Sequence, residues 1–143
     1  MSRLGYEALE HTADAAFRVW GKDLPELFSK AAEAMYSVMV DVASVRPRIS
    51  RALSLSAPDV DLLLHDWLSE LLFLTDVEGL VFSRFEVEVR EEDGSLRLEA
   101  VCWGEPIDPE RHSPETEVKA VTYHDLEVRE EGGVWVAKLV LDI

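Results

Sequence analysis

The sequence has few of the residues on which common site chemistries depend. Cys102 is the only cysteine among 143 residues, so no internal disulfide can form and no zinc site can be built from thiolates. The seven glycines include no GxGxxG or GxxxxGK arrangement, which excludes the common phosphate-binding loops. No apolar stretch reaches the roughly 18 residues of a membrane span, and no basic and apolar leader opens the chain. A single cytosolic domain, residues 1–143, is the simplest prediction.

Basic residues are also scarce. The chain has 14 Lys and Arg against 29 Asp and Glu, a formal net charge of -15. Non-specific binding of nucleic acids depends on Lys and Arg that neutralise phosphates. We therefore expect the protein not to bind RNA or DNA on its own. The charge suits solubility, a basic protein partner or hard cations.

Two segments have the apolar period of a helix. Apolar residues recur on one face of 23–40, where Asp23 and Glu26 have the spacing of a capping box. The second segment, 59–78, has a leucine and tryptophan stripe, and Gly79 is a natural C-terminal stop. We predict a helix in each segment.

The rest of the chain alternates between apolar and polar residues, which is typical of strands. The predicted strands lie near 17–19, 49–55, 81–90, 96–102, 118–129 and 134–143, with Asp93-Gly94 as a hairpin turn. Two helices and several antiparallel strands predict a single-domain α+β fold. We expect one mainly antiparallel or mixed sheet with both helices packed on one face.

The last two predicted strands form a hairpin with one apolar and one mixed face. If its turn holds two or four residues, Lys119, Tyr123 and Asp142 share the mixed face. Ile143 then anchors the end of the chain in the core. The phase of His124 matches the apolar face, so we expect a hydrogen-bonded core histidine there.

Carboxylates near both ends of the chain are candidates for a cation site. Asp14 is out of phase with the apolar residues that follow it, which suits a loop carboxylate or a metal ligand. A metal ligand needs further acidic groups, and Asp142 and the terminal carboxylate are available. A hydrolase built on these carboxylates could use His11 or His124 as its base. Nothing else in the sequence indicates catalysis, so a binding or regulatory protein is the better prediction.

Four segments resemble the archease family. They are HTAD (His11 to Asp14) followed by FRVWG, then LLFLTDVEGLVF, then VKAVTYH, and the ending LDI. They occur in the family's order and span nearly the whole chain. The departure is Ala15-Ala16, where the family tends to have Ile followed by a small residue. This change leaves the acidic position intact.

The resemblance implies a partner and a cation. Archeases are accessory proteins of the RtcB-type RNA ligase, which uses GTP and a divalent metal and passes through a guanylylated histidine. They promote guanylylation and multiple turnover in tRNA splicing and RNA repair. By motif, the family's cation site corresponds to Asp14, Asp142 and Ile143. Calcium is the first candidate, with magnesium or manganese as alternatives.

The resemblance also assigns secondary roles. It favours contact of Lys119 with the ligase or its nucleotide phosphates over a plain surface ion pair near Asp142. It also implies that RNA is met only through the ligase. His11, Tyr123 and His124 lie in the matched motifs and are secondary candidates. Two other functions stay open, a metal-dependent hydrolase and a general chaperone or modulator of tRNA-modifying enzymes.

Overall fold

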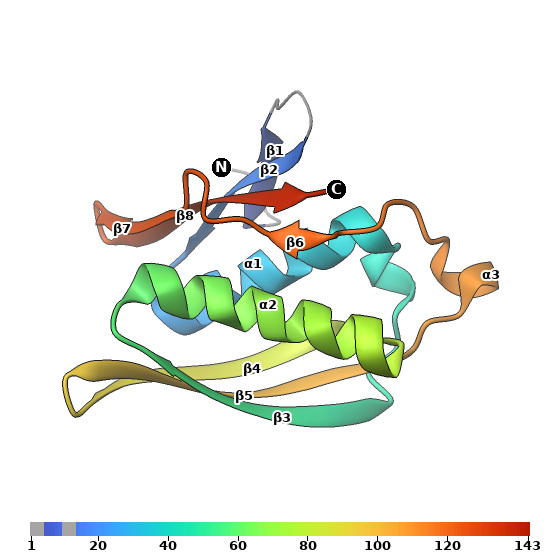
Figure 1. The fold of residues 1–143 in the computed structure, drawn as a ribbon, viewed down its shortest axis with the longest axis horizontal. Coiled ribbons are helices and arrows are strands. Elements are labelled where there is room, and N and C mark those ends of the chain that lie inside the picture. Colours follow the sequence, from blue (N-terminus) through green and yellow to red (C-terminus); the bar gives the residue numbers. More distant parts are fainter. Residues whose placement is uncertain (1–4, 10–13) are drawn as a thin grey trace.

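Two long helices lie between two antiparallel sheets in the computed structural model, which describes residues 5–9 and 14–143 (Figure 1). In chain order the elements are β1 Tyr6–Leu9, β2 Asp14–Gly21, α1 Leu24–Met39, η1 Val42–Ser44, β3 Ile49–Ala57, α2 Val60–Glu78, β4 Leu80–Glu92, β5 Ser95–Pro106, α3 Pro109–His112, β6 Ala120–Val121, β7 Glu127–Glu131 and β8 Val134–Asp142. No helix in these described ranges is both long and apolar enough to cross a membrane.

The strands are divided between the two sheets. One sheet has five strands in the order β1-β2-β8-β6, with β7 also paired to β8, and the other has the order β3-β5-β4. The α+β class is therefore confirmed, but the expected single sheet with both helices on one face is wrong. Both helices contact strands of both sheets. The composition of α1 explains the arrangement, because its buried residues include the adjacent pairs Leu27-Phe28 and Ala31-Ala32 as well as Met35, a wider apolar arc than one sheet requires.

Local signals place the helix ends. Asp23 caps α1 by accepting a hydrogen bond from the backbone N–H of Glu26 at 2.9 Å. Asp59 caps α2 in the same way, and Gly79 ends it in the left-handed conformation with φ +69°. Such caps satisfy backbone groups that have no partner inside the helix. Both predicted helices are confirmed to within a residue or two.

Two tight turns set the register of the hairpins. Asp93 and Gly94 join β4 to β5 with φ of 52° and 79°, and Gly132 and Gly133 join β7 to β8 with φ of 56° and 83°. Positive φ at both central residues fits the twist of a two-residue hairpin. The terminal hairpin therefore has the even turn that its predicted faces require.

The predicted strand over 118–129 is interrupted, and the interruption corrects the predicted faces. Val121 pairs with Leu141, whereas Glu127 pairs with Lys138. Residues 122–126 therefore stand opposite only residues 139–140, an excess of three residues. An odd excess exchanges the two faces of the strand. His124 consequently lies in a turn with its side chain 65% exposed, and the expected core histidine is wrong.

Candidate functional site

The end of β8 brings the first and last parts of the described chain together. Asp14, the first residue of β2, is the direct cross-strand partner of Asp142, the last residue of β8. Directly opposed residues have Cβ atoms about 4.5–5.5 Å apart and side chains on one face of the sheet. Pairing over all eight residues of β2 fixes this register. Two acidic residues 128 positions apart thus share one end of the sheet.

Burial identifies the face on which this carboxylate pair lies. Leu141 and Ala15 form the next cross-strand pair, and Leu141 is fully buried in the core that contains the helices. Successive residues of a strand point to opposite faces, so Asp14 and Asp142 lie on the face turned away from the helices. Both remain in contact with solvent, Asp142 more than Asp14.

Ile143 extends beyond the last paired residue. Its exposed fraction is 36%, and it does not belong to the core cluster of the described residues. The expectation that Ile143 anchors the strand in the core is therefore wrong. The alternation of side chains along β8 places Ile143 on the same face as Leu141. The pairings of β8 with β2 and β6 end at Asp142, however, so no neighbouring strand covers Ile143 among the described residues. The chain terminus is left open to solvent beside the carboxylate pair.

Lys119 lies on the other side of β8 and is joined to it through its main chain. Its backbone N–H donates to the backbone carbonyl of Asp142 at 2.7 Å. Ala120, rather than Lys119, stands directly opposite Asp142. Among the described residues, the Lys119 side chain forms no ion pair, and it is exposed. Lys119 therefore lies one residue before β6, and Ala120 occupies the place on the face of Asp142 where Lys119 was expected, so the expected shared face is wrong for Lys119.

The donor set of the carboxylate pair suits a hard cation. Like charges on directly opposed residues repel each other, and a bound cation removes that repulsion. Carboxylate oxygens are the ligands that calcium and magnesium prefer. Within the part of the chain that the structure describes, no three His, Cys, Asp or Glu residues gather around a common point. Among the described residues, the carboxylate oxygens at this end of the sheet are those of Asp14, Asp142 and the terminal carboxylate.

The secondary candidates are separated from the carboxylate pair. Tyr123 stacks on His65 of α2, with ring centroids 3.8 Å apart and an interplanar angle of 13°. It therefore lies against a helix, whereas Asp142 faces away from the helices, so the expected shared face of Tyr123 and Asp142 is wrong. His124 is 3.3 Å from the Asp125 carboxylate in the exposed turn. His11 lies outside the described residues.

Sequence reasoning missed a buried carboxylate, Glu105, whose exposed fraction is 1%. Its Oε2 accepts hydrogen bonds from the Arg46 backbone N–H at 2.7 Å, Arg111 Nη1 at 2.7 Å and His112 Nε2 at 2.9 Å. His112 Nδ1 accepts from the Asp108 backbone N–H at 2.8 Å, which leaves Nε2 as the protonated nitrogen. This Glu105 hub joins α3, which follows β5, to the segment that precedes β3.

The Glu105 carboxyl is ionised at neutral pH. The Arg111 hydrogen bond lowers the pKa of Glu105 far below its usual range, while burial opposes the shift, and the bonds from Arg46 and His112 lower the pKa further. No sequence period indicated this hub, because its donors come from residues 6 to 59 positions away.

Known proteins match the chain over nearly its full length. Residues 6–143 match the model of the Archease protein family. The chain is 47% identical over 139 residues to the protein archease of Methanosarcina mazei, covering 96% of this chain and 95% of that protein. It is 43% identical over 138 residues to the protein archease of Methanopyrus kandleri, covering 96% and 99%.

Solved structures agree with these matches. The solution structure of Methanobacterium thermoautotrophicum protein 1598 is 42% identical and has a TM-score of 0.88, covering 98% of this chain and 99% of that one. A Thermotoga maritima archease, described as a possible chaperone, shares the fold at 20% identity with a TM-score of 0.63, covering 96% of each chain.

Proposed function

Because the chain belongs to the archease family, we propose that it is a non-catalytic accessory protein that activates an RtcB-type RNA ligase. The observation that carries the proposal is the direct pairing of Asp14 with Asp142 at the end of the chain. These are the two acidic positions that the family motifs assign to a cation. Their opposition on neighbouring strands gives that assignment a physical basis.

A divalent cation, calcium in the first place, is held in this proposal by Asp14, Asp142 and the terminal carboxylate of Ile143. Calcium takes about six to eight oxygen ligands, more than these three groups supply. The remaining positions are open to water or to oxygen atoms of the ligase and its nucleotide. The bound ion neutralises the carboxylates and provides a point of attachment for phosphate or carboxylate oxygens.

Lys119 completes the proposed contact surface. Its backbone bond to Asp142 keeps the residue beside the carboxylate pair while the ammonium group stays exposed. Lysine is a mobile point charge that suits phosphate oxygens. The proposed role of Lys119 is contact with the ligase or with its nucleotide phosphates during guanylylation.

The test compares wild type with Asp142→Asn and with the matched control Asp93→Asn. Asp142→Asn keeps the size of the side chain and removes one ligand charge. The control substitution Asp93→Asn makes the same chemical change in a distant hairpin turn, where asparagine is well tolerated. We expect Asp142→Asn to lose calcium binding in calorimetry and stimulation of ligase guanylylation, with an unchanged circular dichroism spectrum. Full stimulation by Asp142→Asn contradicts the proposal.

The same assays separate the alternative functions. The isolated protein should neither ligate nor cleave RNA, with or without calcium, and substoichiometric amounts should accelerate the ligase. Turnover by the isolated protein, abolished in Asp142→Asn, would instead indicate a metal-dependent hydrolase. Protection of unrelated unfolded proteins from aggregation, without any effect on the ligase, would indicate a general chaperone.

A further inference from the structure

Exposed large apolar side chains gather along α2 and at its two ends. Phe73 and Val77 of this helix are 55% and 65% exposed. Tyr123, 63% exposed, stacks against the first half of the helix, and Ile107, 40% exposed, lies beyond its C-terminus. In the described part of the chain, Ile143 is the only other large apolar residue exposed to this extent. Four of the five therefore border one helix.

The spacing on α2 forms one continuous stripe. Residues 66, 70, 73 and 77 follow the i, i+4, i+7, i+11 pattern of a single helical face. Asp66 and Glu70 thus stand in line with Phe73 and Val77, over about 16 Å of helix. This stripe faces away from the helix's buried residues, which include Leu64, Trp67, Leu68 and Leu71. We call it the α2 stripe.

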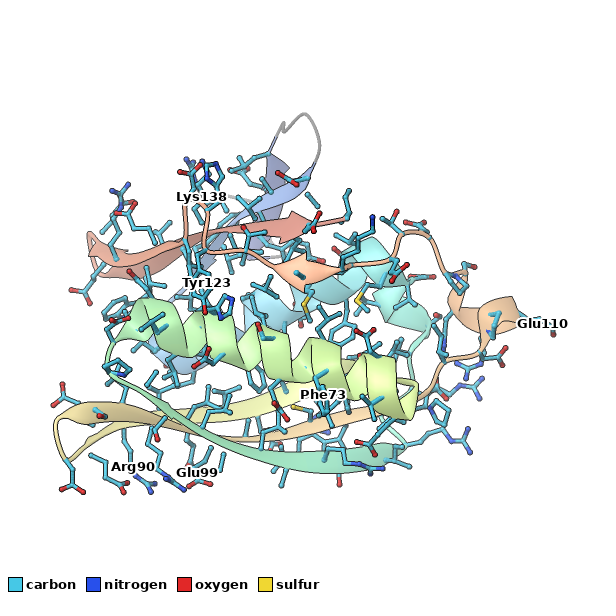
Figure 2. All side chains as sticks on the ribbon, viewed as in Figure 1. Phe73, Arg90, Glu99, Glu110, Tyr123 and Lys138 are labelled. Carbon is cyan, nitrogen blue, oxygen red and sulfur yellow. The ribbon has the colours of Figure 1, made fainter. Side chains whose placement is uncertain are left out.

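Contacts also fix two apolar residues that border α2, Tyr123 beside its first half and Ile107 beyond its C-terminus. His65 donates from Nε2 to the backbone carbonyl of Val121 at 3.0 Å, and its ring supports Tyr123. The Ile107 backbone N–H donates to the carbonyl of Gly79 at 2.8 Å. In Figure 2, Tyr123 and Phe73 flank α2, Tyr123 on the side of the five-stranded sheet and Phe73 on the side of the three-stranded sheet. Apolar groups that are already fixed lose little conformational entropy on binding.

The charge of α2 has one sign. The helix contains five acidic residues and no lysine or arginine. Glu78 pairs with Arg51, and the Asp61 carboxylate accepts the backbone N–H of Val128. Neither Glu70 nor Asp76 forms an ion pair with a described basic residue. The complement of this surface is therefore apolar and basic.

We infer that the α2 stripe, bordered by Tyr123 on one flank of the helix and by Ile107 beyond its C-terminus, is a docking surface for a basic, partly apolar segment of the partner ligase. This inference rests on the proposed function and adds a second contact, on an element that carries none of the proposed cation ligands. Central apolar anchors with a charged rim are the usual anatomy of a binding site between proteins. RNA does not fit this surface, because the carboxylates repel phosphates. A second copy of the chain would oppose one acidic helix with another.

The test measures ligase binding by calorimetry for a double variant, Phe73→Ser with Val77→Ser, and for Glu70→Lys. Glu88→Lys is the matched control, because Glu88 is an exposed acidic residue on β4 of the three-stranded sheet and not on α2. We expect the double variant to raise Kd at least about tenfold, equivalent to about 1.4 kcal/mol. Glu70→Lys should raise Kd and weaken its dependence on salt. Glu88→Lys should stay within about twofold of wild type.

Guanylylation titrations distinguish docking from activation. At saturating concentration the docking variants should reach the wild-type maximum, with the midpoint displaced in proportion to Kd. Wild-type Kd in both variants, alongside wild-type stimulation, overturns the docking inference and leaves the activator proposal standing. Wild-type protein that binds through the α2 stripe without stimulating the ligase contradicts only the activator proposal. Self-association of the wild type that the double variant abolishes, with ligase binding unchanged, assigns the stripe to a second copy and overturns the inference.

Discussion

Replacing Glu105 tests the buried hub that joins α3 to the segment before β3. Glu105→Gln replaces one carboxylate oxygen by an amide NH₂ group, which can donate but not accept. If the NH₂ takes the place of Oε2, it faces the N–H donors of Arg46, Arg111 and His112. If it takes the place of Oε1, it faces Arg111 Nη2, which lies 2.7 Å from that oxygen. The change also leaves the guanidinium of Arg111 without its buried counter-charge. A neutral side chain of the same size therefore breaks the hub electrostatically rather than sterically.

The expected loss follows from the burial of the partners. Removing one member of a buried ion pair costs about 3–5 kcal/mol. Arg111 is 28% exposed and keeps a 2.7 Å bond to the Ser44 carbonyl, so we expect the lower limit, about 3 kcal/mol. For a chain of this length that corresponds to a fall in Tm of roughly 10 °C. Urea denaturation and thermal melts at neutral pH measure both quantities.

The pH dependence gives the sharper test. The pKa of Glu105 is lowered in the folded state, whereas the pKa of a glutamate in the unfolded chain is about 4.3. The stabilisation from ionised Glu105 is therefore complete well above that value and is lost as the pH falls below it. The difference in unfolding free energy between wild type and Glu105→Gln should thus be constant near neutrality and shrink below about pH 4.

A matched control separates burial from charge. Glu99→Gln removes a carboxylate that pairs with Arg97 at 2.9 Å but is 42% exposed, and it should change the unfolding free energy by less than about 1 kcal/mol. Equal losses for Glu105→Gln and Glu99→Gln would refute the argument. A difference for Glu105→Gln that does not change with pH would refute the ionised carboxylate as its source.

Two further predictions concern the end of β8. Lys119→Ala should keep the fold, because the bond to Asp142 comes from the backbone, and should weaken ligase guanylylation; full activation by this variant would reject a role for the ammonium group. A single glycine added after Ile143 converts the terminal carboxylate to an amide and should lower calcium affinity in calorimetry; unchanged affinity would assign any ligand there to the main-chain carbonyl instead.

Sequence patterns predicted the helices because the determining contacts are local. Asp23, Asp59 and Gly79 act within four residues of their own positions, and the apolar period sets the buried faces. The division of strands between two sheets was not accessible in this way. Alternation identifies which residues of a strand are buried, but not the strand with which it pairs. β3 pairs with β5, from which it is separated along the chain by α2 and β4, and such a long-range pairing leaves no local pattern.

The candidate site was predictable in part, for a related reason. Asp14 and Asp142 each fall out of phase with the apolar residues of their own strand, which the local sequence shows, and the register places the two residues opposite each other. The prediction that Lys119 and Tyr123 share the face of Asp142 was wrong because it assumed an uninterrupted strand over 118–129. The three extra residues in 122–126 direct Tyr123 to α2 and expose His124. Asp125 at φ 56° marks this turn, yet aspartate at one position does not reveal an insertion.

The position of the carboxylate pair explains how the fold tolerates it. Next along the strands, Ala15 pairs with Leu141, and then Ala16 with Val140; three of these four residues are buried. Apolar burial at these pairs holds β2 against β8 whether or not the terminal pair is neutralised. Repulsion between Asp14 and Asp142 therefore acts only on the end of the sheet. Because a ligand stabilises whichever state binds it, the proposed cation would stabilise this end of the sheet without requiring any change in the core.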